Sequence, residues 1–286
     1  MKPGTHPPTA TFGPARRQFR VGIAWASVVA VTAIAALAPP FAQPEAYHAF
    51  ADQRTLWGVP NFFDVTSNLA FLAVGLAGLH FTIRGVRARS GAAFQDSSER
   101  LAWGALFAAT ALTCFGSAYY HLAPDSARLA WDRLPMAIGF MALVAAVVSE
   151  RISATAGRRM LVPLCVLGAA SVWYWRWSAA MGFENLNPYI AVQFGSALIV
   201  LLMLALFPAR FDRGGDYLVA VGWYALAKVA ELLDDKIFAA TGGVVSGHTI
   251  KHLLAAAAIF WLLRMLRLRT PAATGTWATA DSSRGA

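Results

Sequence analysis

Apolar stretches about as long as a bilayer is thick alternate with short polar segments along this chain of 286 residues. A helix needs about 20 predominantly apolar residues to cross the hydrocarbon core of a membrane. Charged residues are nearly absent from these stretches and gather between them. The pattern therefore predicts eight transmembrane helices, at residues 21–38, 62–83, 101–120, 134–149, 160–175, 188–207, 217–233 and 249–268.

The two ends of the chain show no apolar period. Residues 1–20 are rich in Pro, Thr and Arg and are expected to form a disordered cytoplasmic tail. Residues 269–286 are expected to form a second, short cytoplasmic tail. The first apolar stretch ends in Ala36-Leu37-Ala38, which resembles a signal-peptide cleavage site, but its length favours an uncleaved helix.

The composition assigns the chain to the membrane class. Hydrophobic residues make up 57% of the chain and charged residues 14%, whereas a soluble domain has about 25% charged residues. We therefore expect an all-α, polytopic membrane helix bundle that forms a single unit.

The distribution of positive charge gives an expected orientation. Cytoplasmic loops collect Lys and Arg. With the N-terminus inside and eight spans, the inner loops and tails hold most of the Lys and Arg. Lys228 lies within a span, and the outer loops and span ends hold only Arg54, Arg128, Arg133, Arg176, Lys236 and Lys251. Both ends should therefore be cytoplasmic. The net charge of +9 then has an explanation that involves no nucleic-acid partner.

Two polar patterns are candidates for chemistry. Ser117 and His121 lie four residues apart, as do His248 and His252, so each pair shares one face of its helix. Asp132 begins the span that follows His121. The predicted topology places all five residues at the extracytoplasmic end of the bundle. Three imidazoles, a carboxylate and a hydroxyl in one place are the components of an open metal site.

Three motifs in this order resemble the alkaline ceramidases: Gly116-Ser-Ala-Tyr-Tyr-His121, Trp131-Asp-Arg-Leu-Pro-Met136 and Gly247-His-Thr-Ile-Lys-His252. They are similar more broadly to a superfamily of seven-helix membrane hydrolases that also holds the progestin and adiponectin receptors. Asn61-Phe-Phe-Asp-Val-Thr-Ser-Asn68 resembles the start of the first core helix of ceramidases. The resemblance covers about residues 45–268, which implies a seven-helix domain there and leaves residues 21–38 as an extra N-terminal transmembrane helix.

The resemblance implies a role for each motif residue. His121, His248 and His252 would bind Zn²⁺, with the fourth position left for water, as in catalytic zinc sites. Asp132 would accept a proton from that water and pass it to the leaving amine. Ser117 would steady the water or the oxyanion. The implied reaction is hydrolysis of a lipid amide, with ceramide as the family substrate, to a fatty acid and an amine.

One departure from the ceramidase pattern concerns calcium. Ceramidases carry an acidic calcium-binding cluster before the first core helix, whereas this region offers only Glu45, Asp52, Asn61 and Asp64. Calcium prefers six to eight oxygen ligands, several of them carboxylates. The departure argues against a calcium site and against strict specificity for ceramide.

Simpler roles for single residues stay open at this point. Ser117 can bond back to a carbonyl of its own helix, and Asp132 can cap the N-terminus of the following helix. Lys228 and Glu231 are three residues apart inside a span, where they are expected to pair with each other.

Three classes of function compete. A zinc amidohydrolase of lipids is favoured. The second class is a ligand-sensing receptor of the same superfamily, which the short tails disfavour. The third is a haem-binding electron carrier. Haem is usually ligated from opposite faces, whereas His248 and His252 share one face.

Overall fold

The computed structural model describes residues 13–84, 93–94 and 97–272, and this part of the chain is helical, with no β-strand. A short 3-10 helix at Glu45–His48 and a π-helical turn at Ala191–Gly195 interrupt the α-helical pattern. The α-helices are α1 (Pro14–Leu37), α2 (Phe62–Thr66), α3 (Leu69–Arg84), α4 (Ser97–Leu122), α5 (Ser126–Arg151), α6 (Ala154–Ala180), α7 (Asn187–Ile190), α8 (Ser196–Leu206), α9 (Asp216–Leu232), α10 (Asp234–Ala240) and α11 (Gly247–Leu268).

Six helical stretches among the described residues are long and apolar enough to cross a membrane. They are α1, α2 together with α3, α4, α5, α7 together with α8, and α11. The predicted membrane helix bundle is therefore confirmed. Helices α6 and α9 belong to the same bundle without meeting that measure, so the count of seven core helices and one added helix stays a prediction.

The helices extend beyond the apolar stretches that predicted them. Helix α1 begins at Pro14, so residues 14–20 are helical rather than part of a disordered tail. Proline suits the first turn of a helix because its missing N–H has no partner there in any case. Residues 1–12 and 273–286, which make up most of the two predicted tails, lie outside the described residues.

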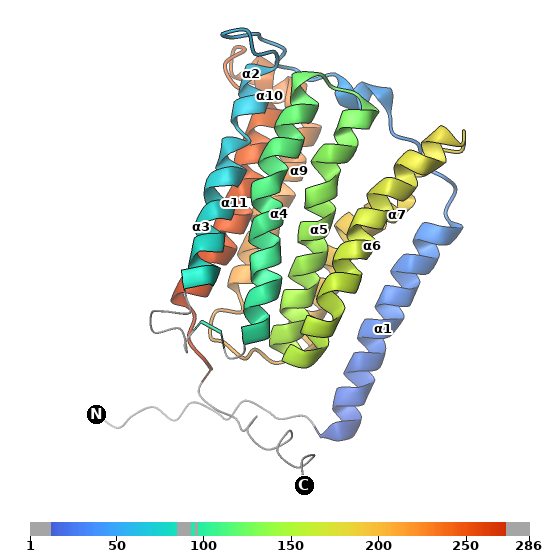
Figure 1. Cartoon of the computed structure of the whole chain (residues 1–286), viewed down its shortest axis with the longest axis vertical. Helices are drawn as coiled ribbons and strands as arrows, with labels where there is room; N and C mark the ends of the chain where they lie inside the picture. The colour runs from blue at the N-terminus through green and yellow to red at the C-terminus, as the bar shows by residue number, and fades with distance from the viewer. Residues whose placement is uncertain (1–12, 85–92, 95–96, 273–286) are drawn as a thin grey trace.

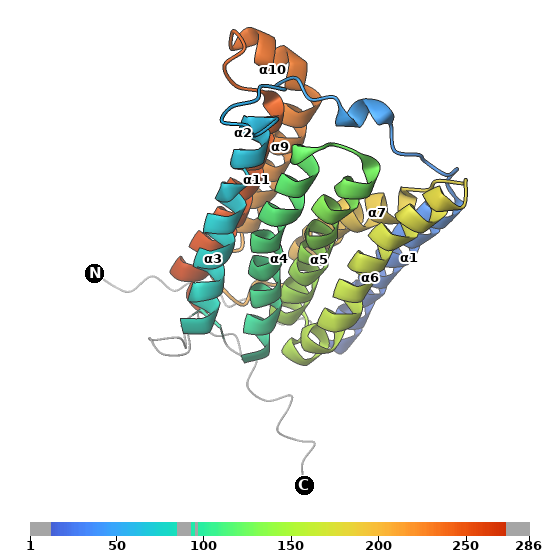
Figure 2. The ribbon, with the colours of Figure 1, turned by 45° about the horizontal axis from the view of Figure 1, so that its top comes forward.

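Helices α4 and α5 pack on each other at the centre of the bundle, with α3 beside α4 and α6 beside α5 (Figure 1). Helix α11 packs on α3 and α9, whereas α8 packs on α5. Helix α1 lies at the margin and contacts α7, α8 and the π-helical turn (Figure 2). The beginning of α1 and the end of α11 lie at the same end of the bundle, and α2 and α10 lie at the other (Figure 1).

A buried ionic cluster closes the end of the bundle where α11 finishes. Glu150 accepts hydrogen bonds from Arg269 and from the Tyr217 hydroxyl, both at 2.8 Å. Arg210 contacts Glu99 at 3.4 Å. The cluster joins α4, α5 and α9 to the residue that follows α11. It holds these helices together at the end of the bundle opposite to the beginning of α11.

Candidate metal centre

Three histidines meet where α4 ends and α11 begins. His121 lies in the last turn of α4, and His248 and His252 lie in the first two turns of α11. One nitrogen from each ring lies within 4.8 Å of the others, and all three side chains are buried. The structure thus brings together the three histidines predicted from their spacing, and they could hold a metal ion.

The donor set fits a metal because one of its imidazoles has no other partner. Both ring nitrogens of His121 are buried and make no hydrogen bond to the protein. Buried polar atoms almost always have a partner, so this ring calls for one that the described residues do not supply. Three neutral imidazoles suit zinc better than they suit the hard cations.

The other two rings are each held by a neighbouring side chain. The Ser67 hydroxyl lies 2.8 Å from Nδ1 of His252, and Nζ of Lys251 lies 2.7 Å from Nε2 of His248. The Ser67 hydroxyl can accept the ring N–H of His252, and such a contact orients an imidazole around a metal and fixes its tautomer. The Lys251 ammonium can only donate, so it contacts the lone pair of Nε2 of His248. The i,i+3 spacing of His248 and Lys251 could have indicated their contact, whereas nothing in the sequence assigned Ser67 to His252.

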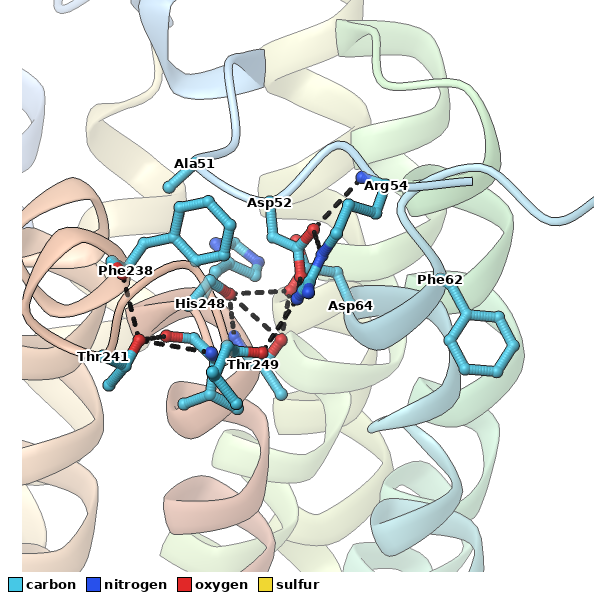
Figure 3. Close-up of polar contacts among 12 residues, drawn as sticks. Ala51, Asp52, Arg54, Phe62, Asp64, Phe238, Thr241, His248 and Thr249 are labelled. Carbon is cyan, nitrogen blue, oxygen red and sulfur yellow. Dashed lines mark hydrogen bonds and ion pairs between the residues drawn. The ribbon is translucent and has the colours of Figure 1, made fainter. Parts of the chain in front are cut away.

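The start of α11 is fixed by a group of polar contacts. Ser246 caps the helix by accepting a hydrogen bond from the Thr249 amide at 3.0 Å. The buried carboxylate of Asp64 accepts hydrogen bonds from the hydroxyls of Thr249 at 2.7 Å and Ser246 at 3.2 Å (Figure 3). Asp234 accepts the His248 amide at 2.7 Å. These contacts set the position of the helix turn that carries His248.

The structure places Ser117 and Asp132 beside each other on α4 and α5. The Ser117 hydroxyl donates a hydrogen bond to the Asp132 carboxylate, and both side chains are buried. Asp132 does not cap its helix, so the expectation that it could be the N-cap of α5 is wrong. The cap is Asp125, which accepts the Arg128 amide at 2.7 Å, because α5 begins eight residues earlier than the apolar stretch predicted.

Helices α4 and α5 approach each other unusually closely at this point. Pro135 lacks the N–H that would bond to the carbonyl of Trp131, so that carbonyl is left without its helical partner. Gly116 of α4 faces it, and a Cβ atom on residue 116 would lie 2.1 Å from the carbonyl oxygen. Only glycine permits this approach, which brings Ser117 and Asp132 within hydrogen-bonding distance.

Residues 39–61, here called the cover segment, lie over the histidines. The ring of Phe50 is buried, with its centroid 4.7 Å from that of His121 and 4.5 Å from that of His248. The Ala51 amide of this segment donates to Asp234 at 3.0 Å, so Asp234 ties the segment to α11. The cover segment therefore separates the histidines from the space beyond this end of the bundle.

A second anchor of the cover segment is an ion pair. Arg54 donates to both carboxylate oxygens of Asp52, at 2.8 and 2.6 Å, and to the Val244 carbonyl at 2.8 Å (Figure 3). Burial tends to raise the pKa of Asp52, but the hydrogen bonds from Arg54 outweigh burial and hold that pKa below its usual value. Asp52 is therefore ionised and paired at neutral pH.

Three of the four residues weighed for calcium binding have other partners. Asp52 pairs with Arg54, and Asp64 bonds to the start of α11. The Asn61 amide donates to the His121 carbonyl at 2.8 Å, at the end of α4. These side chains stabilise the metal centre from the protein side.

A cavity of about 630 Å³ extends from the metal centre into the bundle. Of the three histidines, His252 lines it, next to Ser117 and Asp132. Most of the remaining wall is apolar and includes Leu106, Met136, Phe140, Val200, Ile259 and Leu262. Its mostly apolar lining, with polar side chains beside the histidines, fits a molecule that has a polar group and a large apolar part.

Part of the cavity lining also reaches the surface of the bundle. Three of its lining side chains are also exposed: Phe41 by 49%, Phe194 by 48% and Leu232 by 82%. All three are apolar. An opening with an apolar rim between membrane helices faces lipid more readily than water.

The predicted pair of Lys228 and Glu231 is confirmed: the ammonium and carboxylate form an ion pair. The structure adds two partners that the sequence did not indicate. Glu231 also accepts from Nζ of Lys251 at 3.2 Å and from the Tyr47 hydroxyl at 2.9 Å. All four side chains line the cavity, so the pair belongs to the site and not only to the scaffold.

No family model matches this chain, and no curated protein matches it either. The resemblance to ceramidases therefore stays a prediction from short motifs, and any function must be inferred from the site itself.

Proposed function

We propose that the protein is an integral-membrane, zinc-dependent amidohydrolase that cleaves the amide bond of ceramide or a related N-acyl lipid. The products are a fatty acid and an amine, which is a sphingoid base when ceramide is the substrate. The observation that carries the proposal is the junction of a large, mostly apolar cavity with a polar end formed by Ser117, Asp132 and His252. An acyl chain fits the apolar part while its amide reaches the polar end.

The route into the cavity favours a lipid over a soluble substrate. Phe50 and the cover segment lie between the histidines and the space beyond the bundle. The cavity is instead lined by Phe194 and Leu232, which are apolar and exposed. A substrate dissolved in the bilayer can reach the cavity without crossing water.

His121, His248 and His252 would hold the metal, which when bound supplies a Lewis acid and lowers the pKa of water at the site. Ser67 orients the His252 ring through the contact to Nδ1. The cover segment keeps bulk water away from the histidines, which strengthens electrostatic interactions at the site.

Asp132 is the proposed proton carrier. Its carboxylate accepts a proton from the attacking water, whose oxygen bonds to the carbonyl carbon of the amide. The same group then delivers that proton to the nitrogen, so that the carbon–nitrogen bond breaks and a neutral amine leaves. The hydrogen bond from Ser117 fixes the orientation of the carboxylate for both steps.

We further propose that the metal centre faces the extracytoplasmic side and that both ends of the chain are cytoplasmic. The distribution of Lys and Arg supports this orientation.

The reaction is tested with purified protein in a neutral detergent. Incubation with a panel of N-acyl lipids, with and without a chelator, should release fatty acid and amine that mass spectrometry identifies. We expect the chelator to abolish release and added zinc to restore it. If no amide in the panel is cleaved by the zinc-loaded protein, the proposal is wrong.

A further inference from the structure

The polar end of the cavity carries a cluster of charged side chains beyond the proposed catalytic ones. Lys228 and Lys251 both contact Glu231, and the hydroxyl of Tyr47 donates to the same carboxylate. Lys251 also lies 2.7 Å from the His248 ring. The cluster therefore begins at the metal centre and continues along the cavity wall.

Positive charge exceeds negative charge on this wall. The charged residues that line the cavity are three cations, Lys228, Lys251 and Arg133, and two carboxylates, Asp132 and Glu231. Arg133 is buried and donates to the side-chain oxygen of Gln43 at 2.6 Å. Among the described residues, no carboxylate forms an ion pair with Arg133.

Neutral groups surround the Arg133 guanidinium. It lies over the rings of Trp175 and Tyr189, 4.7 and 4.8 Å from their centroids. These contacts stabilise the cation but leave its charge in place. A desolvated site with surplus positive charge favours an anionic ligand.

We propose that the cluster of Lys228, Lys251 and Arg133 selects substrates whose amine portion carries a carboxylate, that is, N-acyl amino acids. The reaction rests on the proposed function, but binding of the carboxylate does not. The anion would pair with an ammonium group that shares Glu231, through charge-assisted hydrogen bonds. One added negative charge balances the surplus on the wall.

The position of the cluster favours an anion close to the scissile amide. Lys251 contacts both a histidine of the metal centre and Glu231. In an N-acyl amino acid the carboxyl carbon lies about 2.5 Å from the amide nitrogen. An amide at the metal centre therefore places its carboxylate beside the lysines, whereas a head group on a long spacer would extend past them.

The test compares the binding of two nearly isosteric ligands, N-oleoylglycine and its neutral amide N-oleoylglycinamide, to zinc-loaded protein in a neutral detergent. We expect wild type to bind the acid about tenfold more tightly than the amide. Lys228→Met should lose most of this preference, and Lys228→Arg should retain it. Lys228 is the variant site because Lys251 touches His248, so that its replacement would also disturb the metal centre.

The matched control is Lys236→Met, which removes an exposed lysine of α10 outside the cavity and should leave the preference unchanged. Equal affinities for the acid and the amide in wild type would overturn the proposal. So would a preference that survives in folded Lys228→Met, because Lys228 would then not bind the carboxylate.

Oleate release from the same samples separates the two proposals. Tight, Lys228-dependent binding of the acid without any release would support the carboxylate site and contradict the proposed reaction. Release of fatty acid from ceramide, together with equal affinities for the acid and the amide, would support the proposed reaction and contradict the carboxylate site.

Discussion

Gly116 of α4 lies against the main-chain carbonyl of Trp131 in α5, so closely that a Cβ atom on residue 116 would lie 2.1 Å from the oxygen. The residues that follow them, Ser117 and Asp132, are the hydrogen-bonded pair at the polar end of the cavity. A close approach of two backbones therefore sets the geometry of two proposed site residues.

Gly116→Ala should damage the site more than the fold. The added methyl group must push α4 away from α5, because its neighbour is backbone, and such overpacking costs about 1–3 kcal/mol. Misplacement of reacting groups by about 1 Å can lower turnover about 10²-fold. We expect a loss of that order in amide hydrolysis, with the protein still folded in a thermal unfolding assay.

Gly104→Ala is the control on the same helix. A Cβ atom there meets only the Thr82 hydroxyl, at 3.9 Å, so turnover should be unchanged. Similar turnover for the two variants would contradict the role given to the close approach at Gly116.

Removal of any histidine of the metal centre should remove the metal. His121→Ala, His248→Ala and His252→Ala each delete one of three donors, whereas wild type should contain about one zinc per chain. Elemental analysis of purified protein measures the ratio. His80→Ala, on an exposed position of α3, should retain full zinc. Full zinc in all three site variants would exclude this centre.

Ser67→Ala should weaken metal binding without abolishing it. The hydroxyl of Ser67 lies 2.8 Å from Nδ1 of His252, and loss of such an orienting contact typically lowers metal affinity about 10–100-fold. Competition with a zinc chelator of known affinity measures the change. Thr66→Ala is the control, because the Thr66 hydroxyl bonds to the carbonyl of Phe62 in its own helix. Equal affinities in the two variants would leave Ser67 without a role at the metal.

Asp132→Asn should separate proton transfer from metal binding. Asn is nearly isosteric with Asp but cannot accept the proton or deliver it to the leaving nitrogen. We expect zinc content to persist and kcat for amide cleavage to fall about 10²–10⁴-fold. Near-normal turnover with zinc intact would show that Asp132 carries no proton.

The companion variant is Asp125→Asn, at the residue that caps α5. Asn caps a helix about as well as Asp, so both zinc content and turnover should stay near wild type.

The orientation is tested with a cysteine introduced at Ala127 and, separately, at Thr155. Both positions are exposed. Ala127 lies at the beginning of α5 and Thr155 at the beginning of α6, so the two lie at opposite ends of the bundle. A membrane-impermeant thiol reagent applied outside intact cells should label Ala127→Cys and not Thr155→Cys. Wild type, whose Cys114 is buried, gives the background. Labelling of Thr155→Cys alone would place the metal centre on the cytoplasmic side.

The sequence by itself determined the class of fold and the three histidines. Long apolar stretches leave a chain few options other than helices in a membrane, because every backbone polar group must be satisfied within lipid. The spacing of His248 and His252 puts both on one helix face whatever the tertiary fold. The alternation of spans then brings the end of α4 and the start of α11 to the same side, as the structure confirms.

Helix boundaries were harder to predict, because capping residues lie outside the apolar stretches. Asp125, and not Asp132, caps α5. Helix α5 includes about two turns before the apolar stretch that starts at Leu134, and these turns carry the buried polar residues Asp132 and Arg133. For this reason the expected capping role of Asp132 is wrong.

Only the tertiary structure decided what surrounds the histidines. Phe50, Ser67 and Asp234 reach the centre from three different segments, and no periodicity links residues so far apart in sequence. Lys251 reaches His248 within α11, three residues away, but its contact to Glu231 depends on how α11 packs against α9. Contacts of this kind arise from packing between helices, whereas hydrophobic pattern and spacing describe each helix separately.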